Sequence, residues 1–193
     1  MKRDVNMKYN GNSVLRRKEK QVMAEVKEYN VLLVGATGAG KTSFIARHCG
    51  GEFLKEYHPT TRLSVSSCDF NTSAGKVVLN LWEVSDALSA KLRHACYFGT
   101  DAVIVMYDAA SELSYEAVRN YRRDINYYMC GPIIIAGNKC DREDRIPRDP
   151  IITCHKFGFP CYELSTKSGY NCEKPFIHLL RELTGEDDLI PAE

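Results

Sequence analysis

The sequence predicts an α/β fold of three layers, with helices on both faces of a six-stranded, mostly parallel sheet that has one antiparallel strand. Apolar runs typical of buried strands alternate along the chain with helical patterns, which favours a parallel sheet. The loops that carry recognisable motifs follow these strands directly, and ligands bind at the carboxyl ends of the strands in such sheets. The length of 193 residues fits one domain.

The first half of the expected domain contains three strands and one helix. A buried strand is expected at 29–34, where the run is Tyr-Asn-Val-Leu-Leu-Val, and a helix is expected at 43–49 after a glycine-rich loop. The segment 63–70 partly alternates apolar and polar residues, and a second apolar run at 76–82 follows a turn-like stretch at 71–75. The two runs therefore predict an antiparallel hairpin.

The second half continues the alternation of strands and helices. A continuous apolar run at 102–107 is typical of a parallel strand covered on both faces. The segment 114–129 places tyrosine, valine and isoleucine at spacings of three and four, which predicts a helix. Further strands are expected at 132–136 and 160–164, and a helix at 175–183 closes the domain with phenylalanine and leucine on one face.

We expect the chain to have three parts: a basic, flexible extension at 1–28, the main domain at 29–189 and a short tail at 190–193. The extension carries eight Lys or Arg and four Asp or Glu residues, a net charge of +4. A solvated, mostly disordered arm is the preferred interpretation. A nuclear-localisation or partner-binding arm through the basic cluster 16–20 is the alternative.

Composition excludes several classes of protein. A formal net charge of +1 gives no reason to expect nucleic acid or an acidic membrane as a partner. No apolar stretch approaches the roughly 18–20 residues that span a bilayer, and the N-terminus lacks the apolar core of a signal peptide. Lys2 stands where myristoylation requires glycine, and no cysteine lies in the last four positions. We therefore expect a soluble, intracellular monomer without a membrane anchor.

Eight cysteines are present, and none forms a C-x-x-C motif. Because most lie in apolar or helical runs, they are expected to be reduced core thiols of a cytosolic or nuclear protein. Cys154, His155 and Cys161 have the chemistry of metal ligands but lack a paired second half, so a zinc site is not expected.

Residues 35–42 read GATGAGKT, a complete G-x-x-x-x-G-K-[ST] phosphate loop between an expected strand and an expected helix. Glycines let several backbone N–H groups surround one anion, and the helix N-terminus favours negative charge. Lys41 supplies a charge for the β- and γ-phosphates, and Thr42 supplies a hydroxyl for Mg²⁺. The expected phosphate-binding residues are Ala36, Thr37, Gly38, Ala39, Gly40, Lys41, Thr42 and Ser43.

A second motif, Asn138-Lys139-Cys140-Asp141, follows the strand expected at 132–136 and matches the guanine-reading N-K-x-D pattern. Guanine presents two adjacent donors that one carboxylate accepts together, whereas adenine does not, so Asp141 favours guanine. The stem of Lys139 can lie against the base. After the last strand come Ser165, Thr166 and Lys167, a loop whose backbone N–H can reach the guanine carbonyl oxygen.

With these motifs in order, the chain resembles the Ras-like small GTPases over about residues 29–189, and among them most closely the Ran subfamily. The stretches that carry the resemblance to Ran are 47–53, 79–82 and, above all, 168–176. The resemblance implies a P-loop NTPase G domain, GTP or GDP with Mg²⁺ as cofactors, and Thr60 as the second Mg²⁺-coordinating threonine. It also implies nuclear and cytoplasmic localisation. The implied partners are importin-like and exportin-like receptors, an exchange factor and a GTPase-activating protein.

The chain departs from the family where the pattern D-T-A-G-Q-E is expected, because it reads Glu83-Val84-Ser85-Asp86-Ala87-Leu88. Glu83 replaces an aspartate that holds a Mg²⁺-bound water. Asp86 replaces a glycine whose N–H meets the γ-phosphate; it keeps that N–H, but its carboxylate must turn away or disfavour GTP. Ala87 replaces the glutamine that orients the attacking water, so no catalytic side chain is assigned. The bulk of Thr37 can block an activating residue, and the long acidic tail of Ran is lacking.

Two functions follow from this combination. The first is a Ran-like switch that binds GTP and hydrolyses it slowly because the water-positioning glutamine is missing. The second is a pseudo-GTPase that holds guanine nucleotide and presents a fixed surface. The family pattern favours the first, and Thr37, Asp86 and Ala87 favour the second. A Rab-like or Rho-like trafficking GTPase is disfavoured because the lipidation cysteine is lacking.

Overall fold

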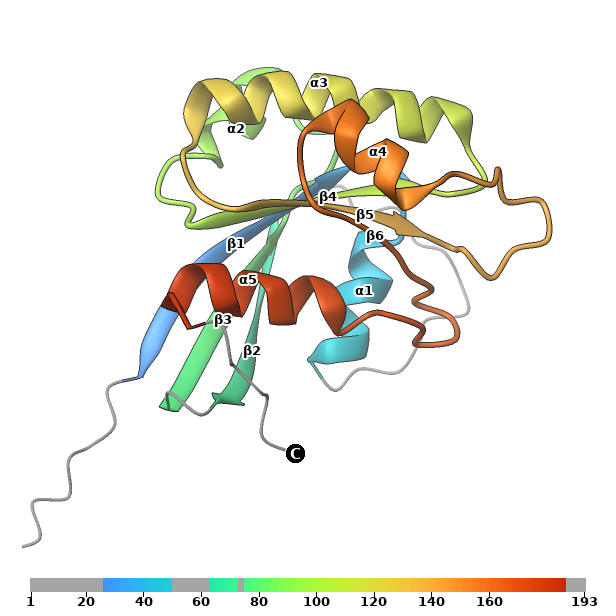
Figure 1. Ribbon diagram of the computed structural model, residues 1–193. Coiled ribbons are helices and arrows are strands. Elements are labelled where there is room, and N and C mark those ends of the chain that lie inside the picture. Colours follow the sequence, from blue (N-terminus) through green and yellow to red (C-terminus); the bar gives the residue numbers. More distant parts are fainter. Residues whose placement is uncertain (1–25, 50–62, 73–74, 187–193) are drawn as a thin grey trace, which may run out of the picture.

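The computed structural model describes residues 26–49, 63–72 and 75–186 and contains one sheet of six strands (Figure 1). The strands are β1 (Lys27–Gly35), β2 (Ser64–Thr72), β3 (Gly75–Glu83), β4 (Ala102–Asp108), β5 (Ile133–Asn138) and β6 (Cys161–Glu163). Their order across the sheet is β2-β3-β1-β4-β5-β6, and only the β2–β3 pair is antiparallel. The predicted α/β sheet and its hairpin are therefore confirmed.

Helices cover both faces of this sheet (Figure 1). They are α1 (Lys41–His48), α2 (Ala90–Ala95), α3 (Glu112–Tyr128), α4 (Pro150–Phe157) and α5 (Lys174–Thr184). Helices α1 and α5 lie on one face, and α2, α3 and α4 lie on the other. No helix in the described part of the chain is both long and apolar enough to cross a bilayer.

Two of these helices, α2 and α4, were not expected from the sequence. Helix α2 has six residues and none of them is buried, so it shows no apolar period. In α4 the side chains of Thr153 and Phe157, one turn apart, are buried, but the helix is only eight residues long. Short helices of this kind are held by tertiary contacts rather than by their own propensity.

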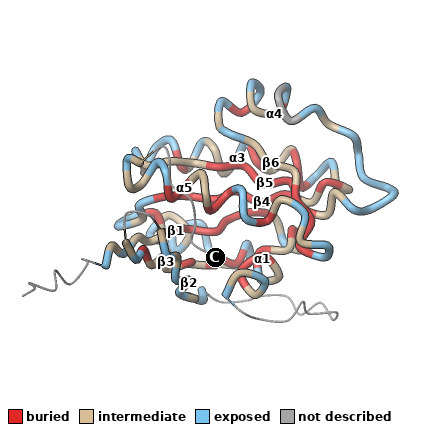
Figure 2. Tube along the Cα trace, turned by 60° about the horizontal axis from the view of Figure 1, so that its bottom comes forward, coloured by how far each residue is buried: buried red, intermediate tan, exposed pale blue. Residues whose placement is uncertain are grey.

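The core consists of two apolar layers separated by the sheet, and Figure 2 shows the buried residues concentrated in the strands. Successive residues of β4 alternate between the layers because side chains of a strand point to opposite faces. Ile104 and Met106 pack on the side of Phe44 and Phe176, in α1 and α5, whereas Val103 and Val105 pack toward α3. Strand β4 is thus covered on both faces, as its continuous apolar run indicated.

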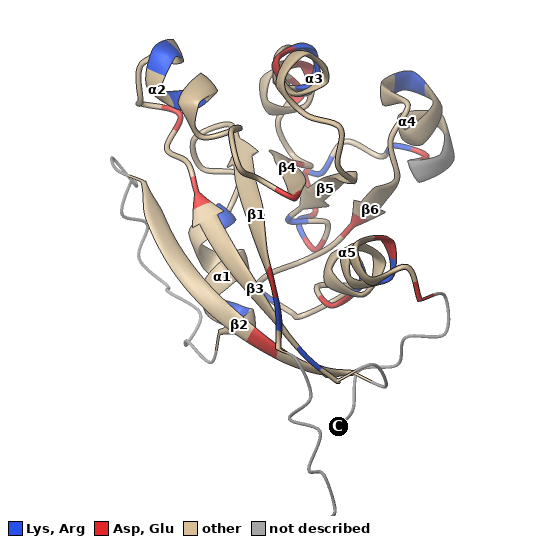
Figure 3. Ribbon diagram, turned by 90° about the vertical axis from the view of Figure 1, so that its left-hand side faces the viewer, with Lys and Arg blue, Asp and Glu red and all other residues tan. Residues whose placement is uncertain are grey.

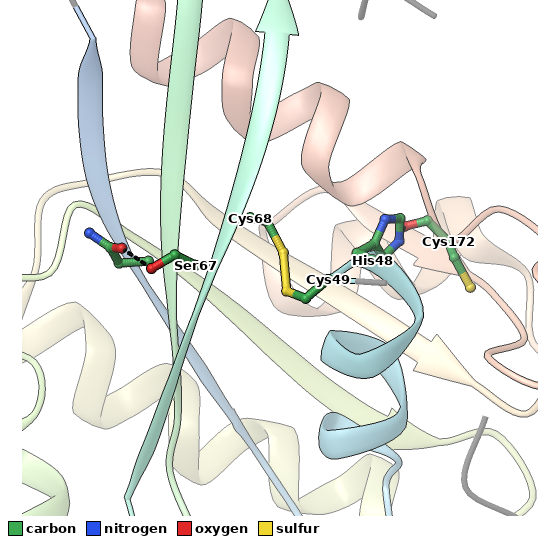
Figure 4. The surroundings of a disulfide bond; sticks show 6 residues. His48, Cys49, Ser67, Cys68 and Cys172 are labelled. Carbon is green, nitrogen blue, oxygen red and sulfur yellow. Dashed lines mark hydrogen bonds between the residues drawn. A yellow bond between two sulfur atoms is a disulfide. The ribbon is translucent and has the colours of Figure 1, made fainter. Parts of the chain in front are cut away.

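Cys49, directly after α1, is joined to Cys68 on β2 by a disulfide whose Cα atoms are 5.3 Å apart (Figure 4). Cys68 is buried in the core layer beneath α1 and α5. The expectation that all eight cysteines are reduced core thiols is therefore wrong for this pair, and the other six are free thiols. Sequence spacing gave no signal for the bond, because it joins a helix end to a strand that lies beside it only in the folded chain.

Candidate nucleotide-binding site

The phosphate loop connects β1 to α1 at the carboxyl edge of the sheet. Gly35 has a φ of +144°, and a Cβ there would lie 2.0 Å from the carbonyl oxygen of Met106, so only glycine lets β1 approach β4 at this point. The Lys41 ammonium donates to the carbonyl oxygens of Gly35 at 2.8 Å and Ala36 at 3.2 Å. The lysine side chain is thereby held back against the first two residues of its own loop.

Lys41 is buried, and this burial lowers the pKa of its ammonium group. The carboxylates of Glu83 and, less strongly, Asp86 oppose that shift. Two acidic side chains, one at the end of β3 and one in the segment after it, therefore act electrostatically on the lysine of the phosphate loop. A phosphate beside Lys41 would favour the charged ammonium in the same way.

Two of the three residues expected near the metal ion, Thr42 and Glu83, touch each other. Thr42 donates its hydroxyl to a carboxylate oxygen of Glu83 at 2.7 Å, and Glu83 is almost fully buried. Glu83, which stands in place of the aspartate of the family pattern, therefore reaches Thr42 directly. Hydroxyl and carboxylate oxygens are the ligands that Mg²⁺ prefers, so this pair fits the ion. Thr60 lies outside the described residues.

Asn138, the last residue of β5, ties the phosphate loop to both base-reading loops. Its side-chain amide nitrogen donates to the carbonyl oxygen of Ala39 at 2.9 Å and to the Thr166 hydroxyl at 3.3 Å. Its amide oxygen accepts from the backbone N–H of Thr166 at 3.0 Å and of Lys139 at 2.8 Å. A Cβ on Gly40 would lie 2.2 Å from the Asn138 amide nitrogen, so glycine is needed for this approach.

The remaining base-reading residues lie beside this junction. The Ser165 hydroxyl donates to one carboxylate oxygen of Asp141 at 2.5 Å, and the exposed Lys167 ammonium lies 3.9 Å from the other. Lys139 has a φ of +65° and its ammonium pairs with Asp108 at 2.7 Å. Because the backbone N–H and the ammonium group of Lys139 are both held, the direction of its aliphatic stem is fixed.

Contacts from the last turn of α1, which we call the buttress and which the motifs did not reveal, support the loop at 165–169 and the residues that follow it. The Arg47 guanidinium donates to the carbonyl oxygen of Thr166 at 3.1 Å and lies against Gly169. His48 contacts the carbonyl oxygen of Cys172 at 2.9 Å, and its ring packs on Phe176 with centroids 4.3 Å apart. Basic residues in the last turn of a helix usually serve the helix dipole, so the sequence offered no sign of this second role.

The segment after β3 is turned toward the helices rather than toward the loops. The Tyr121 hydroxyl on α3 donates to a carboxylate oxygen of Asp86 at 2.8 Å. Arg93 on α2 donates to the carbonyl oxygens of Asp86 at 3.0 Å and Leu88 at 2.7 Å. Ala87 is exposed, and its N–H donates to the Ser85 hydroxyl at 3.2 Å. The carboxylate of Asp86 does turn away, and Tyr121 is the partner that sequence reasoning missed.

Charged side chains are unevenly distributed between the interior of the sheet and its edges. The interior strands β4 and β5 carry no charged side chain before the Asp108 at the end of β4, and charged groups gather at the strand ends and on the outer helices (Figure 3). Thr37 is exposed at the tip of the phosphate loop, and Ser43 is half-buried in the first turn of α1. The structure thus brings the expected residues of 36–43, 138–141 and 165–167 to one edge, whereas Ala87 contributes no polar side chain to it.

Comparison with known protein families gives one match over most of the chain. The model of the Ras family matches residues 30–185. The matched range includes β2 to β6, all of β1 except its first three residues, the phosphate loop, both base-reading loops and the segment after β3.

Proposed function

This chain belongs to the Ras family, and on that premise we propose that it is a Ran-like switch that binds guanine nucleotide with Mg²⁺ and hydrolyses GTP slowly. As a Ras-family protein it is a GTP-binding protein of the switch type. One contrast carries the proposal: the residues for holding GTP are interlocked through Asn138, whereas Ala87 has no group that could orient water.

Base selection falls to Asp141 and Asn138. The Ser165 hydroxyl occupies one oxygen of the Asp141 carboxylate and fixes its orientation. A carboxylate held in this way suits the paired donors of guanine and opposes the bare acceptor of adenine. The hydrogen bonds of Asn138 fix the three loops relative to one another, so the residues that read the base and those that bind the phosphates are structurally coupled.

Phosphate binding falls to the backbone N–H groups of the loop 36–42, to Lys41 and to Thr42. The Lys41 ammonium, now on the carbonyl oxygens of Gly35 and Ala36, can move to phosphate oxygens within the reach of its side chain. Glu83 orients the Thr42 hydroxyl. A bound Mg²⁺ would neutralise charge on the phosphates. These contributions bind GTP and polarise it.

Slow hydrolysis follows from the segment after β3. In GTPases a side chain that orients the attacking water and an arginine supplied by a partner account for much of the rate. Ala87 supplies no hydrogen bond to water, and Thr37 adds a side chain at the tip of the phosphate loop. We therefore place this chain at the slow end of its family unless a partner supplies the missing group.

Two of the three stretches that carry the Ran-like assignment, 47–53 and 168–176, lie far apart in the sequence and touch in the fold. Arg47 and His48 come from one stretch, and Cys172 and Phe176 come from the other. Because these residues form one buttress in the fold, their resemblance to the Ran pattern supports a shared local architecture and not a chance match at separate positions. On this basis we propose transport receptors of the importin and exportin kind, an exchange factor and a GTPase-activating protein as partners, and a place in both nucleus and cytoplasm.

A pseudo-GTPase that holds nucleotide without turnover is the second candidate, and the Asp86–Tyr121 hydrogen bond favours it by fixing the segment on α3. The two candidates are separated by loading the protein with GTP and following single-turnover conversion to GDP, with an ATP-loading control. Conversion that is slow but far above that of GTP in buffer supports the switch. Complete retention of GTP supports the pseudo-GTPase. Equal loading of ATP would refute the guanine assignment.

A further inference from the structure

The carboxylate of Asp86 is held by a clasp that two helices supply. From α3, Tyr121 donates its hydroxyl at 2.8 Å. From α2, Arg93 donates to the Asp86 backbone oxygen at 3.0 Å, and its guanidinium nitrogen lies 4.0 Å from the same carboxylate oxygen. Arg93 is seven residues from Asp86, whereas Tyr121 is 35 residues away, so the hydrogen bond to the carboxylate is built by the tertiary fold.

The clasp controls a charge that reaches the phosphate loop. Asp86 follows Glu83 by three residues, and Glu83 accepts the hydroxyl of Thr42 in the phosphate loop at 2.7 Å, so the segment that carries Asp86 starts in contact with that loop. The same carboxylate would repel the γ-phosphate of GTP more than it repels GDP, because GDP lacks that group. Coulomb repulsion falls with distance and with the local dielectric, so the direction in which Asp86 points decides how strongly it opposes GTP.

We propose that Tyr121, assisted by Arg93, is a positioning residue that sets the preference between GTP and GDP by holding the Asp86 carboxylate against α3. The inference rests on the proposed function, since it presumes that guanine nucleotide occupies the site. With the clasp closed, an aspartate is tolerated where the family has glycine. With the clasp open, the carboxylate is free to approach the phosphates and GTP is disfavoured.

Tyr121 is suited to this role. Its ring packs partly buried against the apolar layer beneath α3, which fixes the position of the hydroxyl. Burial and, second, the hydrogen bond to Asp86 raise the pKa of Tyr121, so the hydroxyl keeps its proton and remains a donor. Substitution by phenylalanine would remove only the hydroxyl and leave the packing of the ring in place.

The test measures the affinities of GDP and a non-hydrolysable GTP analogue by displacement of a fluorescent guanine nucleotide. We expect Tyr121→Phe to weaken binding of the GTP analogue about 10-fold, once screening of the exposed carboxylate is taken into account. GDP binding should change less than about 2-fold. The double variant Tyr121→Phe/Asp86→Asn should recover the wild-type ratio of affinities, because the freed side chain no longer carries a charge.

Tyr128→Phe is the matched control, because Tyr128 is also on α3 and its hydroxyl also contacts α2, at His94 3.3 Å away. It should leave the affinity ratio unchanged. Equal weakening of both nucleotides in Tyr121→Phe, or no recovery with Asp86→Asn, would overturn the clasp while leaving guanine binding intact. A wild-type protein that binds neither nucleotide would overturn both the clasp and the proposed function. Thermal unfolding of each variant shows whether the fold is retained.

Discussion

The site has two regions that are built in opposite ways. The binding region, formed by the loops 35–43, 138–141 and 165–167, is held by buried bonds between loops; Asn138 is 0% exposed, Thr166 4% and Lys41 6%. The switch region, formed by 83–89, exposes Asp86 and Ala87 and is held from outside by α2 and α3. All three loops depend on the Asn138 bonds, so a change at one disturbs the others, whereas Asp86 and Ala87 can differ from the family pattern without breaking the core.

The largest effect on stability is expected from a substitution at Gly40, in the binding region. Gly40→Ala would place a Cβ 2.2 Å from the amide nitrogen of Asn138, and the buried amide cannot yield without losing its bonds. With the positive φ of +94° added, we expect the free energy of unfolding to fall by about 4 kcal/mol. Urea unfolding without nucleotide is the measurement.

Two glycines provide the controls for that substitution. Gly38 in the binding region and Gly99 beyond the switch region have φ of +80° and +75°, and a Cβ at either would meet no atom within 4 Å. Gly38→Ala and Gly99→Ala should therefore each cost only about 1 kcal/mol, the backbone part of the effect. If all three substitutions cost the same, the interlock at Asn138 contributes nothing.

The next effect concerns the disulfide that anchors the end of α1 beside the binding region. Closing a loop of 19 residues is worth about 3 kcal/mol on the chain-entropy account. The double variant Cys49→Ser/Cys68→Ser should be less stable by about this amount in urea. A reductant should lower the stability of the wild type to that of the variant and leave the variant unchanged. A wild type indifferent to reductant would argue against the bond.

A smaller effect, a faster hydrolysis of GTP, is expected when the glutamine of the family pattern is restored in the switch region. Ala87→Gln supplies a side chain that can orient water, and single-turnover GTP hydrolysis should rise about 10-fold. Ala87→Leu has similar bulk without the hydrogen-bonding group and should leave the rate unchanged. No gain from glutamine would indicate that Thr37 or the Asp86 clasp also blocks the reaction, which favours the pseudo-GTPase.

The smallest effect is a pH dependence in the buttress. Burial lowers the pKa of His48 from its ordinary value of 6.5, against the opposing influences of the Cys172 carbonyl and Glu173. Below pH 6.5 the unfolded chain therefore binds a proton that the folded state resists, and stability falls as the pH decreases through the lowered pKa. His48→Gln should remove this part of the slope in urea unfolding between pH 7 and 5. Parallel slopes for both proteins would contradict it.

Sequence reasoning found the sheet and the binding loops because both leave local signals. Apolar runs mark β1, β4 and β5, and the glycines and the Asn138–Asp141 motif mark loops whose chemistry needs fixed residue types. It missed α2 and α4, the disulfide and the contacts of Arg47 and Tyr121. These depend on which segments meet in space, and a lone arginine or tyrosine on a helix carries no sign of its partner across the fold.

The Cys49–Cys68 bond has a topological consequence. Residues 49–68 become a covalent ring, and Thr60 belongs to it. A protease that cuts once inside the ring leaves the two fragments attached to each other, and they separate on a denaturing gel only after reduction. A cut outside the ring releases its fragment at once. Gels run with and without reductant therefore map a single nick to one side or the other of this closure, with no need for an antibody or a label.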